Sequence, residues 1–275
     1  MTWNPYKASE IQKTLQKSDL WLSRSRGQNY LIDRNIASKI VAHIPPDAVV
    51  FEVGCGLGSL TILLPPHKVY AVDIDHGILS LVRELVHDPH IHWIEGDFLT
   101  FDFSSLPEKH LFFLSNLPYS ISGEAIRRFL ELPQFSEGLV MVQQEFYERM
   151  TSTPKKDTYG VFAILTQTFL TVEKLFSVSR NAFFPSPSVD SVVISLHKKE
   201  NVFGLSNGYE EAQRDFRRFL LLAFGSKRKT ILNNLKDHFD KETLLSLFEQ
   251  QGLSPSARPE ELSPQQWQTL YQALR

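Results

Sequence analysis

Val49-Val-Phe-Glu-Val-Gly-Cys-Gly-Leu-Gly58 is the stretch that decides the fold class. Residues 49–53 are mostly β-branched or aromatic and predict a buried strand, and apolar residues return at helical spacing over 60–64. A strand, a glycine turn and a helix form the first unit of a nucleotide-binding α/β sheet. Glycine at positions 54 and 56 lets the backbone approach a ligand closely, because no Cβ atoms stand in the way.

The chemistry of this turn favours a cationic ligand. The glycines follow the order G-x-G-x-G rather than the dinucleotide pattern G-x-G-x-x-G, and Glu52 lies two residues before Gly54. A carboxylate at that position repels a pyrophosphate and attracts a sulfonium or ammonium group. We therefore expect S-adenosylmethionine rather than NAD as the cofactor, bound at Glu52, Gly54 and Gly56.

Three further predicted strands end in polar residues. Residues 68–72 lead to Asp73, residues 91–95 lead to Asp97, and residues 110–115 lead to Asn116. The carboxyl ends of parallel strands meet at one edge of a sheet, so these side chains should join the glycine turn in one ligand site.

The two aspartates suit the nucleoside part of such a ligand. Asp73 lies 19 residues after Gly54, where a carboxylate is placed to accept both ribose hydroxyls. The alternative is a helix N-cap, a role that suits Asp75 better. Asp97 could accept the adenine amino group, with Phe98 or a neighbour packed on the ring.

Asn116-Leu117-Pro118-Tyr119 suits a planar substrate that carries an amino group. Pro118 restricts Leu117 to an extended conformation, so the Leu117 carbonyl is held in one direction. Asn116 adds a side-chain oxygen and Tyr119 adds a flat ring. The alternative is a plain strand-to-loop turn, because Asn and Pro are common turn formers.

The overall composition is that of a globular protein outside membranes. The chain has 275 residues, 42% of them hydrophobic and 22% charged. Cys55 is the only cysteine, so no internal disulfide can form and the reducing cytosol fits. The N-terminus lacks the order of a signal peptide, and no apolar run is long enough to span a bilayer. The histidines show no metal-ligand spacing, and we expect no metal and a cytoplasmic protein.

Basic residues concentrate at the two ends of the chain. Residues 1–50 hold 7 Lys and Arg against 4 Asp and Glu, residues 51–150 hold 6 against 14, and residues 214–236 hold 7 against 1. Basic ends that converge in space could bind a polyanion; the alternative is two solvated faces without a partner. The candidate RNA-binding residues are Arg24, Arg26, Arg217, Arg218, Lys227, Arg228 and Lys229.

The chain divides into two predicted domains. Residues 1–200, with a basic N-terminal arm over 1–32, form the cofactor-binding catalytic domain, whose sheet is completed by strands at 138–142, 172–179 and 191–197. After a linker, residues 208–275 form a small all-helical domain that binds RNA, with helices at 209–224, 227–237, 240–251 and 261–274. Phe183 and Phe184 lie in a proline-rich loop of the first domain, where we expect that they cannot both pack. Stacking on a flipped base would use them, and a small apolar cluster is the alternative.

These motifs together resemble the ribosomal RNA adenine N6-dimethyltransferase family, over nearly the whole chain. Within it, the sequence is most similar to the bacterial enzymes that dimethylate two adjacent adenosines near the 3′ end of small-subunit (16S) rRNA. The resemblance is carried by residues 27–31, 52–58, Asp97, 116–119, 183–191, 224–235 and 257–263.

The resemblance implies a Rossmann-like S-adenosylmethionine-dependent methyltransferase sheet and roles for individual residues. Asn29 and Leu31 would contact the methionine end of the cofactor, and Gly54 would line the same site. Asp73 would bind the ribose, Asp97 the adenine ring, and Asn116 would lie between cofactor and target base. The partner would be 16S rRNA in the small subunit, bound by a monomer.

Three residues depart from the family pattern. Cys55 replaces a usual proline, and its thiol could make the enzyme sensitive to oxidation. Tyr30 replaces a usual phenylalanine. Asp73 is one methylene shorter than the usual glutamate, so the ribose contact would shift or pass through water.

The mechanism we expect is an amide clamp on the target amino group. The Asn116 side-chain oxygen and the Leu117 carbonyl would accept the two N–H bonds of adenine N6, while Tyr119 and Phe183 stack on the base. Two alternatives remain: a methyltransferase acting on one adenine of large-subunit rRNA, of the macrolide-resistance type, and a non-catalytic nucleic-acid-binding factor on the same fold.

Overall fold

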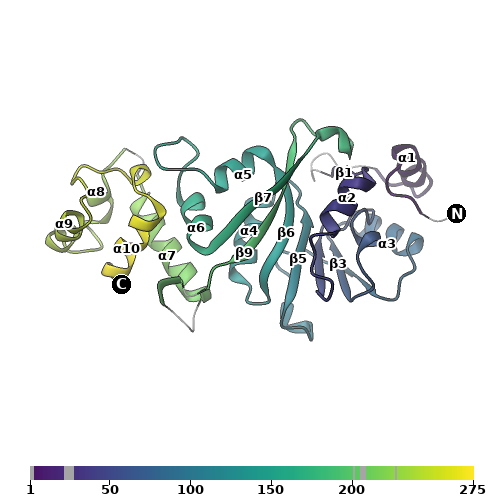
Figure 1. Cartoon of the computed structure of the whole chain (residues 1–275), viewed down its shortest axis with the longest axis horizontal. Helices are drawn as coiled ribbons and strands as arrows, with labels where there is room; N and C mark the ends of the chain where they lie inside the picture. The colour runs from purple at the N-terminus through teal and green to yellow at the C-terminus, as the bar shows by residue number, and fades with distance from the viewer. Residues whose placement is uncertain (1–2, 22–27, 201, 205–208, 227) are drawn as a thin grey trace. The chain divides into compact units, whose positions relative to one another are not determined.

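The computed structural model describes residues 3–21, 28–200, 202–204, 209–226 and 228–275 (Figure 1). The chain forms two compact units. The first unit comprises residues 1–144 and 173–197, and the second comprises residues 145–172 and 198–275.

A seven-stranded sheet forms the centre of the first unit, in the order β4-β3-β2-β5-β6-β9-β7. The five strands from β4 to β6 are parallel, and β9 is antiparallel to β6. The strands are β2 (Val50–Val53), β3 (Val69–Asp73), β4 (Ile91–Glu95), β5 (Leu111–Asn116), β6 (Phe135–Gln143), β7 (Leu170–Val178) and β9 (Ser191–Lys198). The predicted strands and the α/β fold class are thus confirmed.

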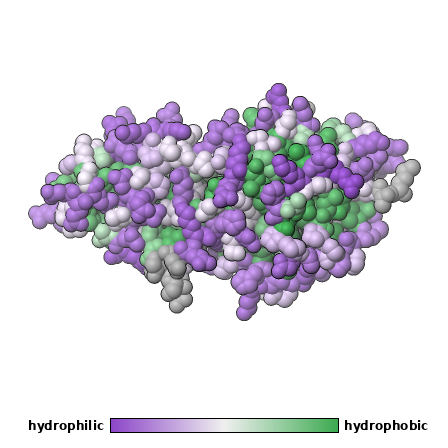
Figure 2. Space-filling model, in the orientation of Figure 1, coloured by the Kyte–Doolittle hydropathy of each residue, from purple (hydrophilic) through white to green (hydrophobic). Residues whose placement is uncertain are grey.

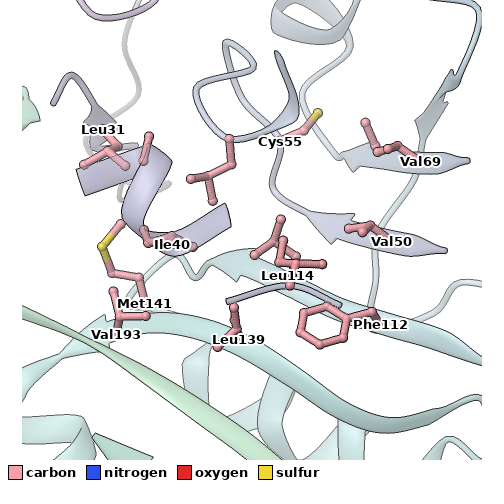
Figure 3. Packing of buried hydrophobic residues seen from close by; sticks show 14 of the residues in the cluster. Leu31, Ile40, Val50, Cys55, Val69, Phe112, Leu114, Leu139, Met141 and Val193 are labelled. Atoms are coloured by element: carbon pink, nitrogen blue, oxygen red, sulfur yellow. The ribbon is translucent and has the colours of Figure 1, made fainter. Parts of the chain in front are cut away.

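Alternating side chains build a separate core on each face of this sheet. On one face, Val50 and Leu114 pack with Ile40 of α2 (Arg34–Val41) and with Val82 of α3 (His76–Leu85) (Figure 3). On the other face, the aromatic rings form a cluster that includes Phe129 of α4 (Ser122–Glu131). The other rings of that cluster are Phe51, Phe98, Phe101, Phe103, Phe113 and Phe135. Because both faces are covered, β2 is buried at all four residues.

The register of the central strands brings their carboxyl ends level. Val53 at the end of β2 lies opposite Val72 of β3 on one side and Ser115 of β5 on the other. Asp73 and Asn116 therefore leave the sheet at the same edge as the glycine loop, residues 54–58. This edge is where ligands bind in open α/β sheets.

The predicted helix after the glycine loop is wrong. The structure has only a short 3₁₀ turn, η2 (Thr61–Leu63), at that point. Pro65 and Pro66 follow immediately, and proline removes a backbone donor and disfavours helical geometry in the residue before it.

A two-stranded antiparallel sheet lies beside the main one. It pairs β1 (Tyr30–Leu31) with β8 (Phe183–Phe184), with Leu31 opposite Phe183. The pairing joins two segments that are some 150 residues apart in the sequence. It places the segment that contains Asn29 against the proline-rich loop.

Helices make up most of the second unit. They are α5 (Gln144–Met150), α6 (Val161–Phe169), α7 (Tyr209–Ala223), α8 (Ile231–Leu235), α9 (Lys241–Gln250) and α10 (Pro264–Leu274). Apolar helix α6 packs against α7 and α10. The Tyr159 hydroxyl donates to the Leu262 carbonyl at 2.6 Å, and the Gln268 amide donates to the Thr168 hydroxyl at 3.3 Å.

The unit boundary therefore differs from the predicted domain boundary. Residues 145–172 pack with the C-terminal helices, whereas the sequence places them in the domain of residues 1–200. The division of labour between a catalytic and an RNA-binding domain remains a prediction. Within the described residues, no helix is both long enough and apolar enough to cross a membrane.

Candidate active site

A cavity of about 340 Å³ lies in the first unit, where β2, β3, β4 and β5 end. Its volume falls within the range of small-molecule sites. The structure brings together all the stretches that the sequence predicts at this edge. The lining consists of residues 28–31, 52–56, 59–60, 72–74, 96–99 and 116–121.

The glycine loop has a backbone that only glycine adopts readily. Gly54 has φ +71° and Gly56 has φ +52°, both in the left-handed region. A Cβ atom at Gly56 would lie 2.8 Å from Cε1 of Tyr30, which is too close for a real contact. The loop is tied to the sheet by hydrogen bonds from the Gly54 and Cys55 N–H groups to the Val72 carbonyl.

Asp73 holds the glycine loop from the side of the neighbouring strand. One carboxylate oxygen accepts the Gly56 N–H at 2.8 Å, and the other accepts the Asp75 N–H at 2.9 Å. A carboxylate oxygen can accept more than one hydrogen bond, so this arrangement still allows ribose hydroxyls to donate to Asp73. The N-cap alternative applies to Asp75, whose side chain accepts the Ile78 N–H at the start of α3.

Glu52 lies at the cavity but does not carry the charge expected from the sequence. Its side chain is 2% exposed and accepts the Thr61 hydroxyl at 2.6 Å. Burial is the main cause that raises the pKa of Glu52 to about 8; the Thr61 bond works against this rise and the nearby Asp73 carboxylate adds to it. At neutral pH the carboxyl is therefore mostly protonated. Glu52 would attract a cationic group by losing its proton when that group binds, rather than by a negative charge that is present beforehand.

The Asp97 region shows which apolar side chains lie near the predicted adenine site: Phe98 and Ile74 both line the cavity. Asp97 lines the cavity, and its carboxylate accepts the Leu99 N–H at 2.9 Å. The Phe98 ring is 2% exposed and packs in the aromatic cluster, 5.2 Å from Phe113, so it is not free to cover a base. Ile74 is the apolar residue that sequence reasoning missed: it lines the cavity and is 61% exposed. A large apolar residue between two aspartates after a strand was the available signal.

The Asn116 carboxamide has a defined orientation. Its Nδ2 donates to the Asn29 carbonyl at 3.1 Å. A carbonyl can only accept, so the amide nitrogen must face it, and the amide oxygen is the atom that remains for an N–H of a ligand. The Leu117 N–H donates to the Met141 carbonyl at 3.1 Å and its side chain is buried, which holds the residue whose carbonyl leads into Pro118.

Tyr119 is anchored through its hydroxyl. The ring is half-buried, and the hydroxyl lies 3.1 Å from Oγ of Ser191, the first residue of β9. Burial raises the pKa of Tyr119, so the phenol is neutral at physiological pH. Ser191 was not singled out as a site residue from the sequence, since nothing in the sequence shows that β9 reaches Tyr119.

Phe183 does not reach the cavity, and the expectation that the two phenylalanines cannot both pack is wrong. Phe183 is 3% exposed and belongs to the core cluster with Leu31 and Ala37. Phe184 packs against a second cluster that contains Tyr30. The antiparallel β1–β8 pair directs successive side chains to opposite sides, and each side offers an apolar partner. Stacking of Phe183 on a base would require it to leave the core.

Cys55, like Phe183, has a buried side chain. Its side chain is 5% exposed, and burial raises the pKa of the thiol, with Asp73 and Glu52 adding to the effect. Oxidation proceeds through the thiolate, which this environment disfavours. Burial therefore argues against the expected sensitivity to oxidation, which stays a prediction.

Comparison with known proteins shows the family to which the chain belongs. A family model described as "Ribosomal RNA adenine dimethylase" matches residues 22–275. The chain belongs to this family. A ribosomal RNA small subunit methyltransferase A of Malacoplasma penetrans is 37% identical over 253 residues, 90% of each protein.

Two solved structures resemble this dimethylase over most of its length. A dimethyladenosine transferase from Plasmodium falciparum is 27% identical with a TM-score of 0.71, covering 88% of this chain and 98% of that one. The 23S rRNA methyltransferase ErmE is 25% identical with a TM-score of 0.69, covering 90% and 99%. The predicted family and enzyme class are confirmed: the chain is an rRNA adenine dimethyltransferase that uses S-adenosylmethionine.

The residues of the cavity fit that cofactor. The bare backbone at Gly54 leaves room beside β2, since nothing lies closer than 3.8 Å to its Cβ position, and Asp73 and Asp97 supply acceptors at the ends of the next two strands. Among the described residues, no group of three or more His, Cys, Asp or Glu side chains could hold a metal ion.

Four of the predicted RNA-binding residues of the dimethylase lie in the second unit. Arg218, Arg228 and Lys229 are exposed and Arg217 is half-buried. The face of this unit in Figure 2 is largely hydrophilic. Asn234 lies in the stretch 224–235 but was not singled out from the sequence; it donates to the carbonyls of Ala223 and Ser226 and so holds the turn before Arg228. Arg24, Arg26 and Lys227 lie outside the described residues.

Proposed function

We propose that this enzyme dimethylates N6 of two adjacent adenosines in the loop of a hairpin near the 3′ end of 16S rRNA. The substrate would be the small ribosomal subunit, which places the reaction in the cytoplasm, and the enzyme would act as a monomer. The name of the relative from Malacoplasma penetrans and the resemblance of the C-terminal motifs support the choice of subunit. The orientation of Asn116 carries the chemical part of the proposal.

The amide clamp follows from that orientation. Adenine N6 is a poor nucleophile because its lone pair is delocalised into the ring. With its nitrogen committed to the Asn29 carbonyl, Asn116 presents an oxygen that accepts one N6–H, and the Leu117 carbonyl accepts the other. Two acceptors favour a pyramidal nitrogen and stabilise the positive charge that develops on it.

The rest of the cavity positions the two reactants. When bound, the cofactor supplies a methyl group on a sulfonium centre. Asn29 and Leu31 bind its methionine end, Gly54 and Gly56 let it lie against the backbone, and Glu52 ionises beside its positive charge. Asp73 accepts the ribose hydroxyls, and Asp97 meets the adenine ring. Tyr119 stacks on the target base, held by its bond to Ser191.

Proton removal needs no strong base in this scheme. The nitrogen that has gained a methyl group is cationic, and its proton is acidic enough to leave to water. Pro118 contributes by shaping the turn: its carbonyl accepts the Ile121 N–H at 3.1 Å at the start of α4. The exposed Arg218, Arg228 and Lys229, with the half-buried Arg217, would contact RNA phosphates.

The proposed function is tested by measuring which ribosomal particle the enzyme methylates. Purified enzyme and S-adenosylmethionine labelled in its methyl group are offered to immature small subunits, to large subunits and to naked rRNA. We expect label in a hairpin loop near the 3′ end of 16S rRNA in small subunits. Label confined to 23S rRNA would favour the large-subunit alternative, and no label on any RNA would contradict the proposal.

A further inference from the structure

The N-terminal segment, residues 3–20, lies against the outside of the cofactor cavity. No motif in its sequence indicates chemistry. Its helix α1 (Ala8–Lys17) buries Ile11 and Leu15, which are 0% and 4% exposed. Both side chains pack in a cluster with Tyr30 and Leu57, together with residues of α3. Tyr30 and the glycine loop are two walls of the cavity, so α1 supports both from behind.

Two hydrogen bonds tie this segment to the glycine loop directly. The Trp3 indole N–H donates to the Leu57 carbonyl at 3.0 Å, and the Tyr6 hydroxyl donates to the Ser59 carbonyl at 2.5 Å. These carbonyls flank Gly58, which has φ +80°. Burial raises the pKa of Tyr6 to about 12, so the phenol stays a donor over the physiological range.

A further contact carries the support to Gly56. The Tyr30 ring lies so close to Gly56 that a Cβ atom there would be 2.8 Å from Cε1. Tyr30 also belongs to the buried cluster that contains Ile11 and Leu15. No residue of the segment 3–20 lines the cavity, whose described lining begins at Gln28. The segment can therefore act on the cofactor only through the walls.

We propose that residues 3–20 are a brace that positions the glycine loop for S-adenosylmethionine, with Trp3 and Tyr6 as positioning residues. A loop with three glycines in the left-handed region has many other conformations available, because glycine is the least restricted residue. Hydrogen bonds to the Leu57 carbonyl of the loop and to the Ser59 carbonyl directly after it, with a ring against Gly56, remove those conformations before the cofactor arrives. Preorganisation of this kind raises affinity without a new contact to the ligand.

The test is a double variant, Trp3→Phe with Tyr6→Phe, which removes both donors and keeps both rings. Its affinity for S-adenosylhomocysteine, measured by calorimetry, should fall about 25-fold, since each of the two missing bonds is worth about a factor of five. Hydrogen exchange at residues 54–60 of the free protein should be faster than in the wild type. At saturating cofactor, kcat and the KM for RNA should stay within about twofold of the wild-type values.

Tyr159→Phe is the matched control. It removes the same kind of bond, a tyrosine hydroxyl donating to a backbone carbonyl, in the second unit. Tyr159→Phe should lower thermal stability about as much as the double variant does, and it should leave the affinity for S-adenosylhomocysteine unchanged. If the double variant behaves like this control, the segment only stabilises the fold and the proposal is overturned. Should the double variant fail to fold, Tyr6→Phe alone is measured and should lose affinity about threefold to fivefold.

The inference rests on the proposed position of the cofactor in the cavity, which Gly56→Ala tests separately. If Gly56→Ala binds S-adenosylhomocysteine with wild-type affinity, the position of the cofactor is wrong. If Gly56→Ala loses affinity and the double variant does not, only the brace is wrong.

Discussion

The cofactor cavity of the first unit differs from the basic surface of the second unit, formed by Arg217, Arg218, Arg228 and Lys229, in the kind of evidence that supports it. In the cavity, each wall has an identified reason for its position: Asp73 and Tyr30 hold the glycine loop, and the Asn29 carbonyl orients Asn116. On the basic surface, the evidence is mainly exposed charge, held locally by Asn234 before Arg228 and by the ion pair of Arg218 with Asp215 at 3.6 Å. A small-molecule site is specified by backbone geometry, whereas binding to a polyanion depends mainly on where positive charges lie.

This difference predicts two kinds of response to mutation. A change in the cavity should act on one step, either cofactor binding or methyl transfer, and should depend strongly on the atom removed. A change on the basic surface should act on RNA affinity alone and should depend on salt. Variants in the two regions should therefore differ in which quantity they change.

Asn116→Ala should have the largest effect. Removing the acceptor should lower the single-turnover rate of methyl transfer about 10³-fold, the upper end for loss of one preorganised hydrogen-bonding group. Affinity for S-adenosylhomocysteine should fall less than about fivefold, because the carboxamide acts on the target nitrogen. Asn181→Ala, at an exposed position, is the control and should change neither quantity. Equal losses in rate and cofactor affinity would contradict the clamp.

Gly56→Ala should lower cofactor affinity by about 100-fold. The left-handed backbone and the clash with Tyr30 together make the cofactor-binding conformation of the loop about 2–3 kcal/mol less favourable. Gly252→Ala in the second unit is a matched control. Gly252 has φ +63°, similar to the +52° of Gly56, but nothing lies within 4 Å of its Cβ position. It should lose stability and keep cofactor affinity. Calorimetry of both variants separates backbone strain from the effect of the loop.

Glu52→Gln should remove a pH dependence of stability. The folded pKa of about 8 lies above the ordinary value of 4.5, so the folded protein keeps a proton that the unfolded chain releases. The contribution of Glu52 to the free energy of unfolding therefore falls as pH rises from 4.5 to 8. The fall should be about 2 kcal/mol between about pH 5 and pH 7.

Denaturant unfolding of both proteins at several pH values measures this difference. Relative to the wild type, Glu52→Gln should become progressively more stable as pH rises. A difference that does not change with pH would show that Glu52 is ionised in the free enzyme.

The double variant Arg228→Ala with Lys229→Ala should lower RNA affinity about tenfold near 0.1 M salt. The slope of log affinity against log salt should become shallower by about 0.7–0.9 for each phosphate that the protein no longer neutralises. Cofactor affinity should not change. Lys155→Ala with Lys156→Ala removes two exposed charges from the same unit and is the control. If both double variants weaken binding equally, the contacts are not specific to the turn of Arg228.

Phe183→Leu should have the smallest effect. A buried leucine fills most of the same space, so we expect a loss of stability of about 1 kcal/mol and a kcat within about threefold of the wild type. Tyr119→Leu should lower kcat by at least about tenfold, since it removes the ring that we place on the base. A large loss of kcat in Phe183→Leu at saturating RNA would restore the stacking role of Phe183.

The parts of this molecule that could be predicted from the sequence are those that depend on local geometry. The glycines of residues 54–58, the aspartate after β3 and the proline at 118 each mark a backbone requirement, and parallel topology brings their strand ends together. Family resemblance added the assignment of rRNA adenine as substrate. None of these steps needed knowledge of distant contacts.

The parts that could not be predicted depend on packing between distant segments. Phe183 is buried because β8 pairs with β1, and the pKa of Glu52 is raised because the residues around it exclude water. Trp3 and Tyr6 belong to no motif, and only the fold shows that they reach the glycine loop. Burial and the pairing of distant segments are set by the whole chain, so a local pattern does not record them.

The central claim is that one cavity holds the cofactor and clamps the amino group of two adenines in turn. The direct measurement is nucleoside analysis by mass spectrometry of 16S rRNA from immature small subunits treated with the purified enzyme and S-adenosylmethionine. We predict two N6,N6-dimethyladenosines per subunit, at adjacent positions, and formation of this product about 10³-fold more slowly with Asn116→Ala. Methyl groups on a ring nitrogen or on ribose, or an Asn116→Ala enzyme that forms the same product at the same rate, would contradict the account.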